Sequence, residues 1–223
     1  MAEHSHSLFR DTSGWSTISA QHGSSFTLWF TGLAGTGKTT LAGLVCKALL
    51  ARGYKAEIID TGALARWLKQ ELHIDEHMPE EASHTPGYDA FITYICTILA
   101  RNGVISLTPA ISPYRQARIH AREHLPRFIE IYLHCSPQQR EARRPRNENI
   151  SVAANLAEAI YEPPPYPELS IDTTAESAER SALRILDYLE QHSYIAPLWE
   201  AAEMDDAEIT LIKARLQALG YLD

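Results

Sequence analysis

The sequence predicts an α/β fold: a five-stranded, mostly parallel sheet with helices on both of its faces, followed by a C-terminal helical extension. One pattern in the sequence and one rule of chain topology support this prediction. Short apolar runs alternate five times with segments of helical periodicity, and right-handed crossovers between parallel strands place such helices on both faces of one sheet. The chain has 223 residues, a length that favours one principal domain.

The first strand and helix are expected on either side of a glycine-rich turn. The run 26–30 is apolar and rich in β-forming residues. In the helix expected over 38–51, apolar residues recur at helical spacing, and Gly53 follows where a glycine commonly ends a helix. The run 56–59 predicts a second buried strand, which ends at Asp60.

The middle of the chain continues the alternation. Residues 62–72 read as a helix, and a polar loop with two prolines separates them from an apolar helix over 88–101. Asn102-Gly103 stops that helix, because glycine and asparagine favour turns. A strand at 104–107 and a helix at 113–124 follow.

The last alternation includes a polar, proline-rich stretch. A strand over 128–133 and a short helix over 137–144 precede this stretch, residues 145–167, which we expect to be mobile. A short strand at 169–171 is the last strand of the sheet, and a helix at 175–190 completes the alternation. The apolar side of that helix is expected to carry Leu183, Leu186 and Leu189. Further on, residues 208–219 have the pattern of one amphipathic helix.

The composition excludes several classes of protein. Lys and Arg number 20 against 28 Asp and Glu, so the net charge is −8, whereas a protein that binds nucleic acid polymers is usually basic. No apolar run reaches the roughly 18 residues of a membrane span and no secretory signal is visible, so we expect no membrane partner. Three cysteines without metal-ligand spacing predict buried thiols in a reduced, cytoplasmic setting.

The glycine-rich turn is the strongest motif. Residues 32–39 read G-L-A-G-T-G-K-T and fit G-x-x-x-x-G-K-[ST] at every fixed position, between a strand and a helix. The expected fold is therefore the three-layer fold of P-loop NTPases. Lys38 can reach the β- and γ-phosphates of ATP, and Thr39 can bind the bridging Mg²⁺. The residues expected to bind the nucleotide are Gly32, Leu33, Ala34, Gly35, Thr36, Gly37, Lys38, Thr39 and Thr40.

Other features favour a kinase that acts on a small molecule. The N-K-x-D motif of GTPases does not occur in the sequence. A single P-loop with a polar segment after the fourth strand is typical of nucleotide and metabolite kinases, whose lid closes over the phosphates and excludes water. We therefore expect a flexible arm at 1–24, a P-loop kinase domain at 25–192 with its lid at about 143–167, and a helical extension at 193–223.

Further motifs follow in the order found in adenylyl-sulfate (APS) kinases, and the chain resembles this family over roughly residues 25–190. Residues 29–42 resemble the family's W-F-T-G-L-S-G-A-G-K-T-T-L-A, and residues 111–115 match its I-S-P-Y-R. Asp60 ends the second strand where the family has D-G-D-N. The remaining matches are residues 128–132 to F-I-E-V, 141–145 to E-x-R-D-P, 161–169 to Y-E-x-P-x-x-P-E-L and 171–173 to the strand after it.

The resemblance implies ATP-dependent phosphorylation of the ribose 3′-hydroxyl of adenosine 5′-phosphosulfate. Lys38 and Asp60 would then be catalytic, with Thr39 and Asp60 near the metal. Arg143 would be the lid arginine near ATP. The acceptor pocket would be lined by Ser112, Pro113 and Tyr114. Because APS kinases are commonly dimers, the analogy also suggests a homodimer.

The acceptor half departs from the family pattern. Where the family reads D-G-D-N-x-R, residues 60–65 read D-T-G-A-L-A, and residues 86–91 lack the arginines and asparagine of the family's R-x-x-N-x-R-R. The lid also lacks the family's F-T-G-I segment. In the family, the lost basic groups hold the sulfate–phosphate end of the acceptor. Either the acceptor is not APS, or other basic residues replace them. The candidates are Arg66, Lys69, Arg115, Arg118 and Arg122.

Several readings stay open at this point. Asp60 either orients the attacking hydroxyl or caps the end of its strand. The face shared by Arg115, Arg118 and Arg122 is either an anion patch or a solvated basic face. Tyr88, Phe91 and Tyr94 either pack internally or offer a surface to a new acceptor. The protein is either an active kinase or a degenerate ATP-binding homologue with a regulatory or scaffolding role. As a kinase it would use MgATP, and its acceptor would be APS or another nucleotide- or sugar-like alcohol.

Overall fold

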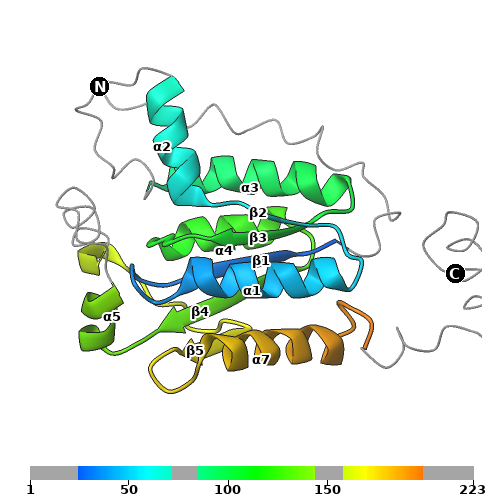
Figure 1. Ribbon diagram of the computed structural model, residues 1–223. Coiled ribbons are helices and arrows are strands. Elements are labelled where there is room, and N and C mark those ends of the chain that lie inside the picture. Colours follow the sequence, from blue (N-terminus) through cyan, green and yellow to red (C-terminus); the bar gives the residue numbers. More distant parts are fainter. Residues whose placement is uncertain (1–24, 72–84, 144–157, 198–223) are drawn as a thin grey trace, which may run out of the picture.

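The computed structural model describes residues 25–71, 85–143 and 158–197, and a sheet of five parallel strands lies at its centre (Figure 1). The strand order is β2-β3-β1-β4-β5. The strands are β1 (Thr27–Thr31), β2 (Ala56–Ile58), β3 (Ile105–Pro109), β4 (Phe128–His134) and β5 (Leu169–Asp172). The helices are α1 (Lys38–Ala51), α2 (Thr61–Glu71), α3 (Pro86–Arg101), α4 (Arg115–His124), α5 (Pro137–Arg143) and α7 (Ala178–Gln191). The predicted α/β fold and its five strands are confirmed.

Helices cover both faces of the sheet. α1 packs against α7 on one face, and α3 packs against α4 on the other. The central strand β1 serves both layers, because Leu28 and Phe30 point into the α1–α7 core while Trp29 points into the α3–α4 core. All three side chains are fully buried. The prediction that Trp29 and Phe30 are core residues is therefore confirmed.

The carboxyl ends of the five parallel strands meet at one edge of the sheet. In Figure 1 the start of α1, the start of α2 and the short helix α5 all lie at this edge. In parallel α/β sheets, ligands bind in the crevice beyond the carboxyl ends of the strands. The glycine-rich turn therefore lies where this fold class places its ligands.

Caps explain why several helices begin away from their expected positions. α3 begins two residues early, since Pro86 suits a first helical turn and Thr85 caps it by accepting a hydrogen bond from the Tyr88 N–H at 3.3 Å. α7 begins three residues late, because Ser177 caps it through the Arg180 N–H. As expected, Gly53 follows α1 with a left-handed φ of 80°.

Two predictions about burial are wrong. The second strand was expected to be buried, but β2 lies at the edge of the sheet and its residues are half-buried or exposed. Leu183 was expected on the apolar side of its helix, but it is 59% exposed, because the face that meets the sheet runs through Ala182, Ile185, Leu186 and Leu189.

The cysteines and the terminal segments complete the comparison with the sequence. Cys46 and Cys96 are buried thiols as predicted, whereas Cys135, after β4, is only half-buried. The predicted arm at 1–24, most of the lid (144–157) and the helix at 208–219 lie outside the described residues. In the part of the chain that is described, no helix is long and apolar enough to span a membrane.

Candidate active site

The loop after β1 is built around glycines that no other residue could replace. A Cβ atom on Gly32 would lie 2.2 Å from the carbonyl oxygen of Leu133, and one on Gly35 would lie 2.6 Å from that of Arg140. Both glycines have positive φ, 146° and 82°. The backbone of the loop therefore packs directly against the end of β4 and against α5. This close packing holds the loop in a tight turn before the first turn of α1.

Lys38 lies at the first position of α1 and folds back over this loop. Its Nζ donates hydrogen bonds to the carbonyl oxygens of Gly32 at 2.7 Å and Leu33 at 2.8 Å. Burial lowers the pKa of Lys38 to about 7, a shift partly opposed by the nearby Cys135 thiol. A phosphate in the loop would favour the charged ammonium, so the site is suited to an anionic ligand. Thr39 and Thr40 are exposed at the same helix end.

Asp60 lies directly beyond β2, and both readings of this residue are compatible with its position. Its Oδ1 accepts a hydrogen bond from the N–H of Ala63 at 2.9 Å, so it caps the start of α2. The next residue, Thr61, fastens this segment to β3, because its hydroxyl donates to the carbonyl oxygen of Pro109 at 2.9 Å. The carboxylate is therefore fixed at the same sheet edge as Lys38.

Arg66, a candidate replacement cation, is exposed on α2 and approaches Asp60. A Cβ atom on Gly62 would lie 3.5 Å from Oδ1 of Asp60 and 3.6 Å from Nη1 of Arg66. Atoms of both side chains therefore lie close to the same point beside Gly62. The side chain of Lys69 lies outside the described part of the molecule.

The predicted acceptor segment, Ser112 to Tyr114, forms a tightly held loop after β3. Ser112 is buried and has a left-handed φ of 43°, which is rare for a residue with a side chain. Its hydroxyl accepts a hydrogen bond from Nε1 of Trp29 at 3.1 Å and donates one to Oδ1 of Asp89 at 2.9 Å. The carbonyl of the next residue, Pro113, accepts a hydrogen bond from the Glu162 N–H at 2.9 Å.

The basic face predicted on α4 is neither an anion patch nor fully solvated. Arg118 is 2% exposed, and its Nε lies 2.7 Å from Oε1 of Glu130. It also donates to the carbonyl oxygens of Ser112 and Glu162, each at 2.5 Å. Arg122 is partly exposed and pairs with Glu168 at 2.5 Å. These two charges are therefore already neutralised by carboxylates.

Arg115, the first member of that face, has an exposed side chain. Arg115 begins α4, and its backbone N–H donates to Oε2 of Glu162 at 2.7 Å. It thus remains a candidate to meet the acceptor, together with Arg66.

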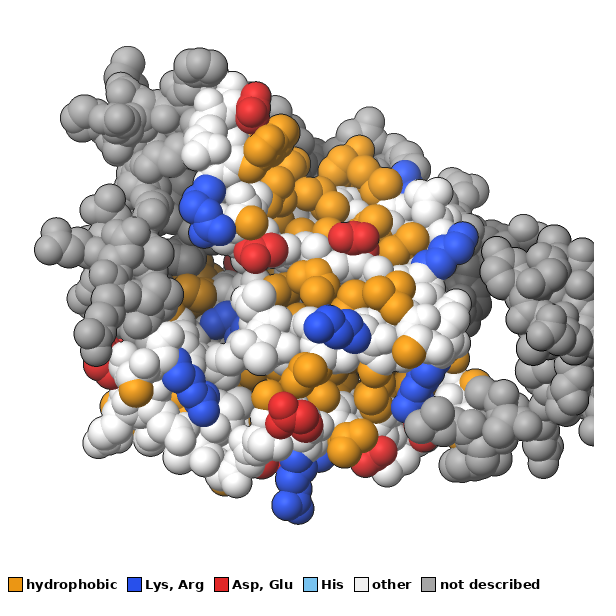
Figure 2. Space-filling view, viewed as in Figure 1, with side chains coloured by type: hydrophobic (Ala, Val, Ile, Leu, Met, Phe, Trp, Pro, Cys, Tyr) orange, Lys and Arg blue, Asp and Glu red, His pale blue; other side chains and the backbone are white. Residues whose placement is uncertain are grey.

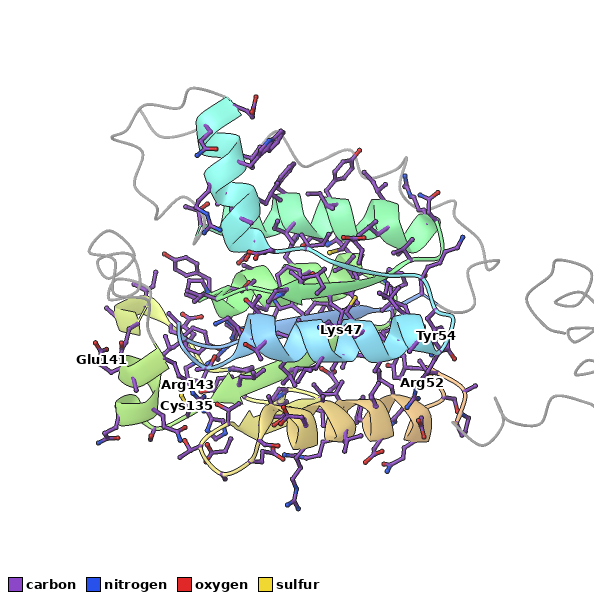
Figure 3. The ribbon with its side chains drawn as sticks, viewed as in Figure 1. Lys47, Arg52, Tyr54, Cys135, Glu141 and Arg143 are labelled. Atoms are coloured by element: carbon purple, nitrogen blue, oxygen red, sulfur yellow. The ribbon has the colours of Figure 1, made fainter. Side chains whose placement is uncertain are left out.

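The predicted nucleotide arginine is connected to the P-loop by one threonine. Arg143 donates from Nη1 to Oγ1 of Thr173 at 3.0 Å and from Nη2 to the Thr173 carbonyl oxygen at 3.1 Å. The Thr173 hydroxyl in turn donates to the backbone carbonyl of Thr36 at 3.2 Å. Figure 3 shows Arg143 on the side of α5 nearer the start of α1, with Glu141 on the outer side.

Sequence reasoning missed three residues of this site. Asp89 lies in a stretch noted only for what it lacks. Thr173 ends the run 171–173, which resembles the strand after a family motif, but the resemblance assigns it no role. Tyr161, whose hydroxyl lies 3.0 Å from that of Thr31, belongs to the Y-E-P motif and could have been found there.

The aromatic residues of α3 divide between two roles. The Tyr88 hydroxyl donates to the Thr61 carbonyl oxygen at 2.5 Å and so connects α3 to the Asp60 segment. Phe91 and Tyr94 are 41% and 46% exposed, so they are not internal packing residues. Figure 2 shows hydrophobic side chains gathered over α2 and α3, where Trp67 and Ile98 are also exposed.

Comparison with known proteins identifies relatives of this chain. Residues 24–172 match the family model described as adenylylsulphate kinase. The chain is 33% identical over 176 residues to the adenylyl-sulfate kinase of Halothermothrix orenii, covering 76% of this chain and 91% of that protein.

Solved structures give the same result. The APS kinase of Mycobacterium tuberculosis in complex with AMPPNP and APS aligns with a TM-score of 0.60 and 28% identity, over 75% of this chain and 98% of that one. A hexameric APS kinase from Thiobacillus denitrificans aligns with a TM-score of 0.55 and 27% identity, over 78% of this chain and 30% of that one.

Proposed function

The chain belongs to the adenylyl-sulfate kinase family, and from this membership we propose that it transfers the γ-phosphoryl group of MgATP to a hydroxyl group of a small acceptor. That it is a nucleotide-binding phosphotransferase acting on a hydroxyl group follows from the family itself. The residues that carry out the transfer, the metal and the identity of the acceptor form the proposal. Adenosine 5′-phosphosulfate is the nearest candidate acceptor, and another nucleotide- or sugar-like alcohol is its competitor.

The P-loop supports the donor half of this proposal. Its inward-turned backbone and the N-terminus of α1 would hold the phosphates of ATP, and the Lys38 ammonium would exchange its two carbonyl partners for phosphate oxygens. Arg143 would cover the donor from the side of α5, in a position that Thr173 maintains. The single observation that carries the proposal is Lys38, which folds over a loop that only glycines could form, at the edge of the sheet where Asp60 lies.

The residues around the P-loop also fit Mg²⁺. Among the described residues, no group of three or more His, Cys, Asp or Glu side chains could hold a metal. Mg²⁺ commonly takes one or two protein oxygens and completes its shell with phosphate oxygens and water. The Thr39 hydroxyl and the Asp60 carboxylate would be those ligands. Bound there, Mg²⁺ would neutralise charge on the phosphates during transfer.

The acceptor would lie between Asp60 and the Ser112–Tyr114 loop. Asp60 would orient the attacking hydroxyl, since phosphoryl transfer depends mainly on positioning and on charge stabilisation. Arg66 and Arg115 are the exposed cations nearest to this region by sequence. We extend the proposal to a kinase domain at 25–192, with its lid at about 143–167 and appended segments at 1–24 and 193–223, and to a homodimer by family analogy.

The decisive experiment measures MgATP-dependent phosphorylation of APS and of a panel of nucleosides and sugars. Lys38→Ala should abolish transfer to any acceptor that the wild-type protein uses. Lys47→Ala is the matched control, because Lys47 is an exposed lysine on the same helix (Figure 3) and should leave transfer unchanged. If Lys38→Ala retained substantial turnover, the proposed site would be wrong. Binding of MgATP without turnover on any acceptor would favour the regulatory alternative.

A further inference from the structure

A buried carboxyl group is hydrogen-bonded to the acceptor loop, the segment Ser112–Tyr114. Asp89, in the first turn of α3, is 2% exposed. Its Oδ1 accepts the hydrogen bond from the Ser112 hydroxyl, whereas its Oδ2 has no hydrogen-bond partner among the described residues. Burying a carboxylate oxygen without a partner is costly. A hydrophobic residue at this position would avoid that cost, so the carboxyl group calls for a functional explanation.

The geometry of Ser112 gives Asp89 its first role. A serine at φ 43° persists only when its surroundings hold it there. Three contacts do so: Trp29 and Asp89 bind the hydroxyl, and Arg118 binds the carbonyl oxygen. Asp89 is therefore a positioning residue for the loop that leads into Tyr114.

The charge of Asp89 gives it a second role. Two titratable groups face it: the Tyr88 phenol on its own helix and the Arg118 guanidinium on α4. The Tyr88 phenol also interacts electrostatically with Asp60, beyond β2. Glu130 on β4 already pairs with Arg118 at 2.7 Å. Arg118 is the one cation among these groups, and Glu130 already balances its charge. Ionised Asp89 would therefore add a net negative charge next to the acceptor loop.

The protonation state of this group can change near neutral pH. Burial raises the pKa of Asp89 to about 7, although the Ser112 hydrogen bond and the Arg118 charge both act to lower it. The carboxyl group would thus be mostly ionised at pH 8 and mostly protonated at pH 6.

We infer that Asp89 is a specificity-determining residue that disfavours acceptors with an anionic group at the Ser112–Tyr114 side of the site. The inference rests on the proposed function and deepens it. The preferred acceptor class is an alcohol that is uncharged where it meets this loop, such as a nucleoside or a polyol, rather than a phosphosulfate.

The test compares two ligands that share a ribose 3′-hydroxyl and differ in charge, APS and adenosine. Their dissociation constants are measured by calorimetry on the full chain, with Mg²⁺ and AMPPNP present so that no turnover is needed. The variant is Asp89→Asn, which keeps an oxygen for Ser112 and removes the charge. The matched control is Asp187→Asn, an equal change of charge at an exposed position on α7.

At pH 8, Asp89→Asn should bind APS about tenfold more tightly than the wild type, the effect of one unit charge at close range. Adenosine should bind both proteins equally, and Asp187→Asn should match the wild type. Lowering the pH from 8 to 6 should tighten APS binding by the wild type but not by Asp89→Asn. The charge of APS itself does not change between pH 8 and pH 6. Any effect of pH on the donor site would alter adenosine binding as well, so adenosine is the control for that effect.

The inference is overturned if Asp89→Asn and the wild type have the same affinity for APS at pH 8, including no detectable binding by either. It is also overturned if the affinity for adenosine shifts equally. If Asp89→Asn does not fold, as judged by thermal unfolding, the wild-type pH comparison decides alone, and a constant APS affinity from pH 8 to 6 refutes the inference. Failure of the proposed function is a separate result, namely no MgATP-dependent transfer to any acceptor.

Discussion

Replacing Arg118 by methionine should destabilise the protein and disorganise the acceptor loop together. The guanidinium is buried, and all three of its nitrogen groups are bound: to Glu130 at 2.7 Å, and to the carbonyl oxygens of Ser112 and Glu162 at 2.5 Å. Removing one partner of a buried ion pair costs about 3–5 kcal/mol, because the other charge remains buried. Methionine keeps most of the side-chain volume, so the loss reports mainly on these polar contacts.

Urea unfolding measures the free energy of unfolding directly. For Arg118→Met we expect a loss in that range, which corresponds to a fall in melting temperature of roughly 10 °C for a domain of this size. Arg122→Met is the matched control on the same helix. Arg122 is partly exposed, and it pairs with Glu168 at 2.5 Å and, more distantly, with Glu130 at 3.4 Å. Such partly exposed pairs contribute about 1 kcal/mol or less.

The double variant separates stability from site geometry. Replacing both Arg118 and Glu130 by methionine should regain most of the lost stability, since apolar pairs often substitute for buried ion pairs at no net cost. It should not regain acceptor use, because the Ser112 carbonyl remains without its donor. If Arg118→Met loses less than about 1 kcal/mol, or no more than Arg122→Met, the account of this cluster is refuted.

Three further predictions concern the donor half. Gly32→Ala should abolish MgATP binding in calorimetry, because its Cβ would lie 2.2 Å from a backbone oxygen, whereas Gly43→Ala on α1, with no atom within 4 Å, should leave binding intact. Thr173→Val should raise the KM for ATP several-fold in steady-state kinetics, because Thr173 connects Arg143 to the P-loop. Thr97→Val should leave the KM unchanged, because the Thr97 hydroxyl donates within its own helix, α3. Burial lowers the pKa of Lys38 to about 7, while phosphate favours the ammonium form. MgATP binding at pH 8 should therefore take up a proton, measured by calorimetry in buffers of different ionisation enthalpy, and at pH 6 the uptake should largely vanish.

The same lysine links stability to pH. Because the folded pKa of Lys38 lies below the unfolded value of 10.5, its contribution opposes folding fully below pH 7. That opposition diminishes as the pH rises from 7 towards 10.5. In the protein without nucleotide, Lys38→Met should therefore increase the free energy of unfolding more at pH 6 than at pH 9.

The parts of the fold that the sequence predicts well are those set by local pattern. The P-loop, the strand through Trp29 and the end of α1 at Gly53 all depend on neighbouring residues and on backbone conformation. The errors lie where burial depends on distant partners. β2 has the composition of a buried strand, but its half-burial follows from its place in the strand order. Leu183 fits the helical period, but the sheet meets a face rotated away from it.

The same distinction explains why the two halves of the site differ in how far they can be read from sequence. The donor half is largely backbone, and the contact that holds Lys38 spans six residues at most. The acceptor half is made by side chains that meet across the fold: Asp89 binds Ser112 over 23 positions, and Arg118 reaches Glu162 over 44. Periodicity on α4 suggested that Arg118 was available to an anion, whereas its partners show that it is already engaged. Whether a cation is free to bind a ligand is a property of the folded neighbourhood. The charges that remain unpaired are therefore the ones that can select an acceptor, and at the Ser112 loop that charge belongs to Asp89.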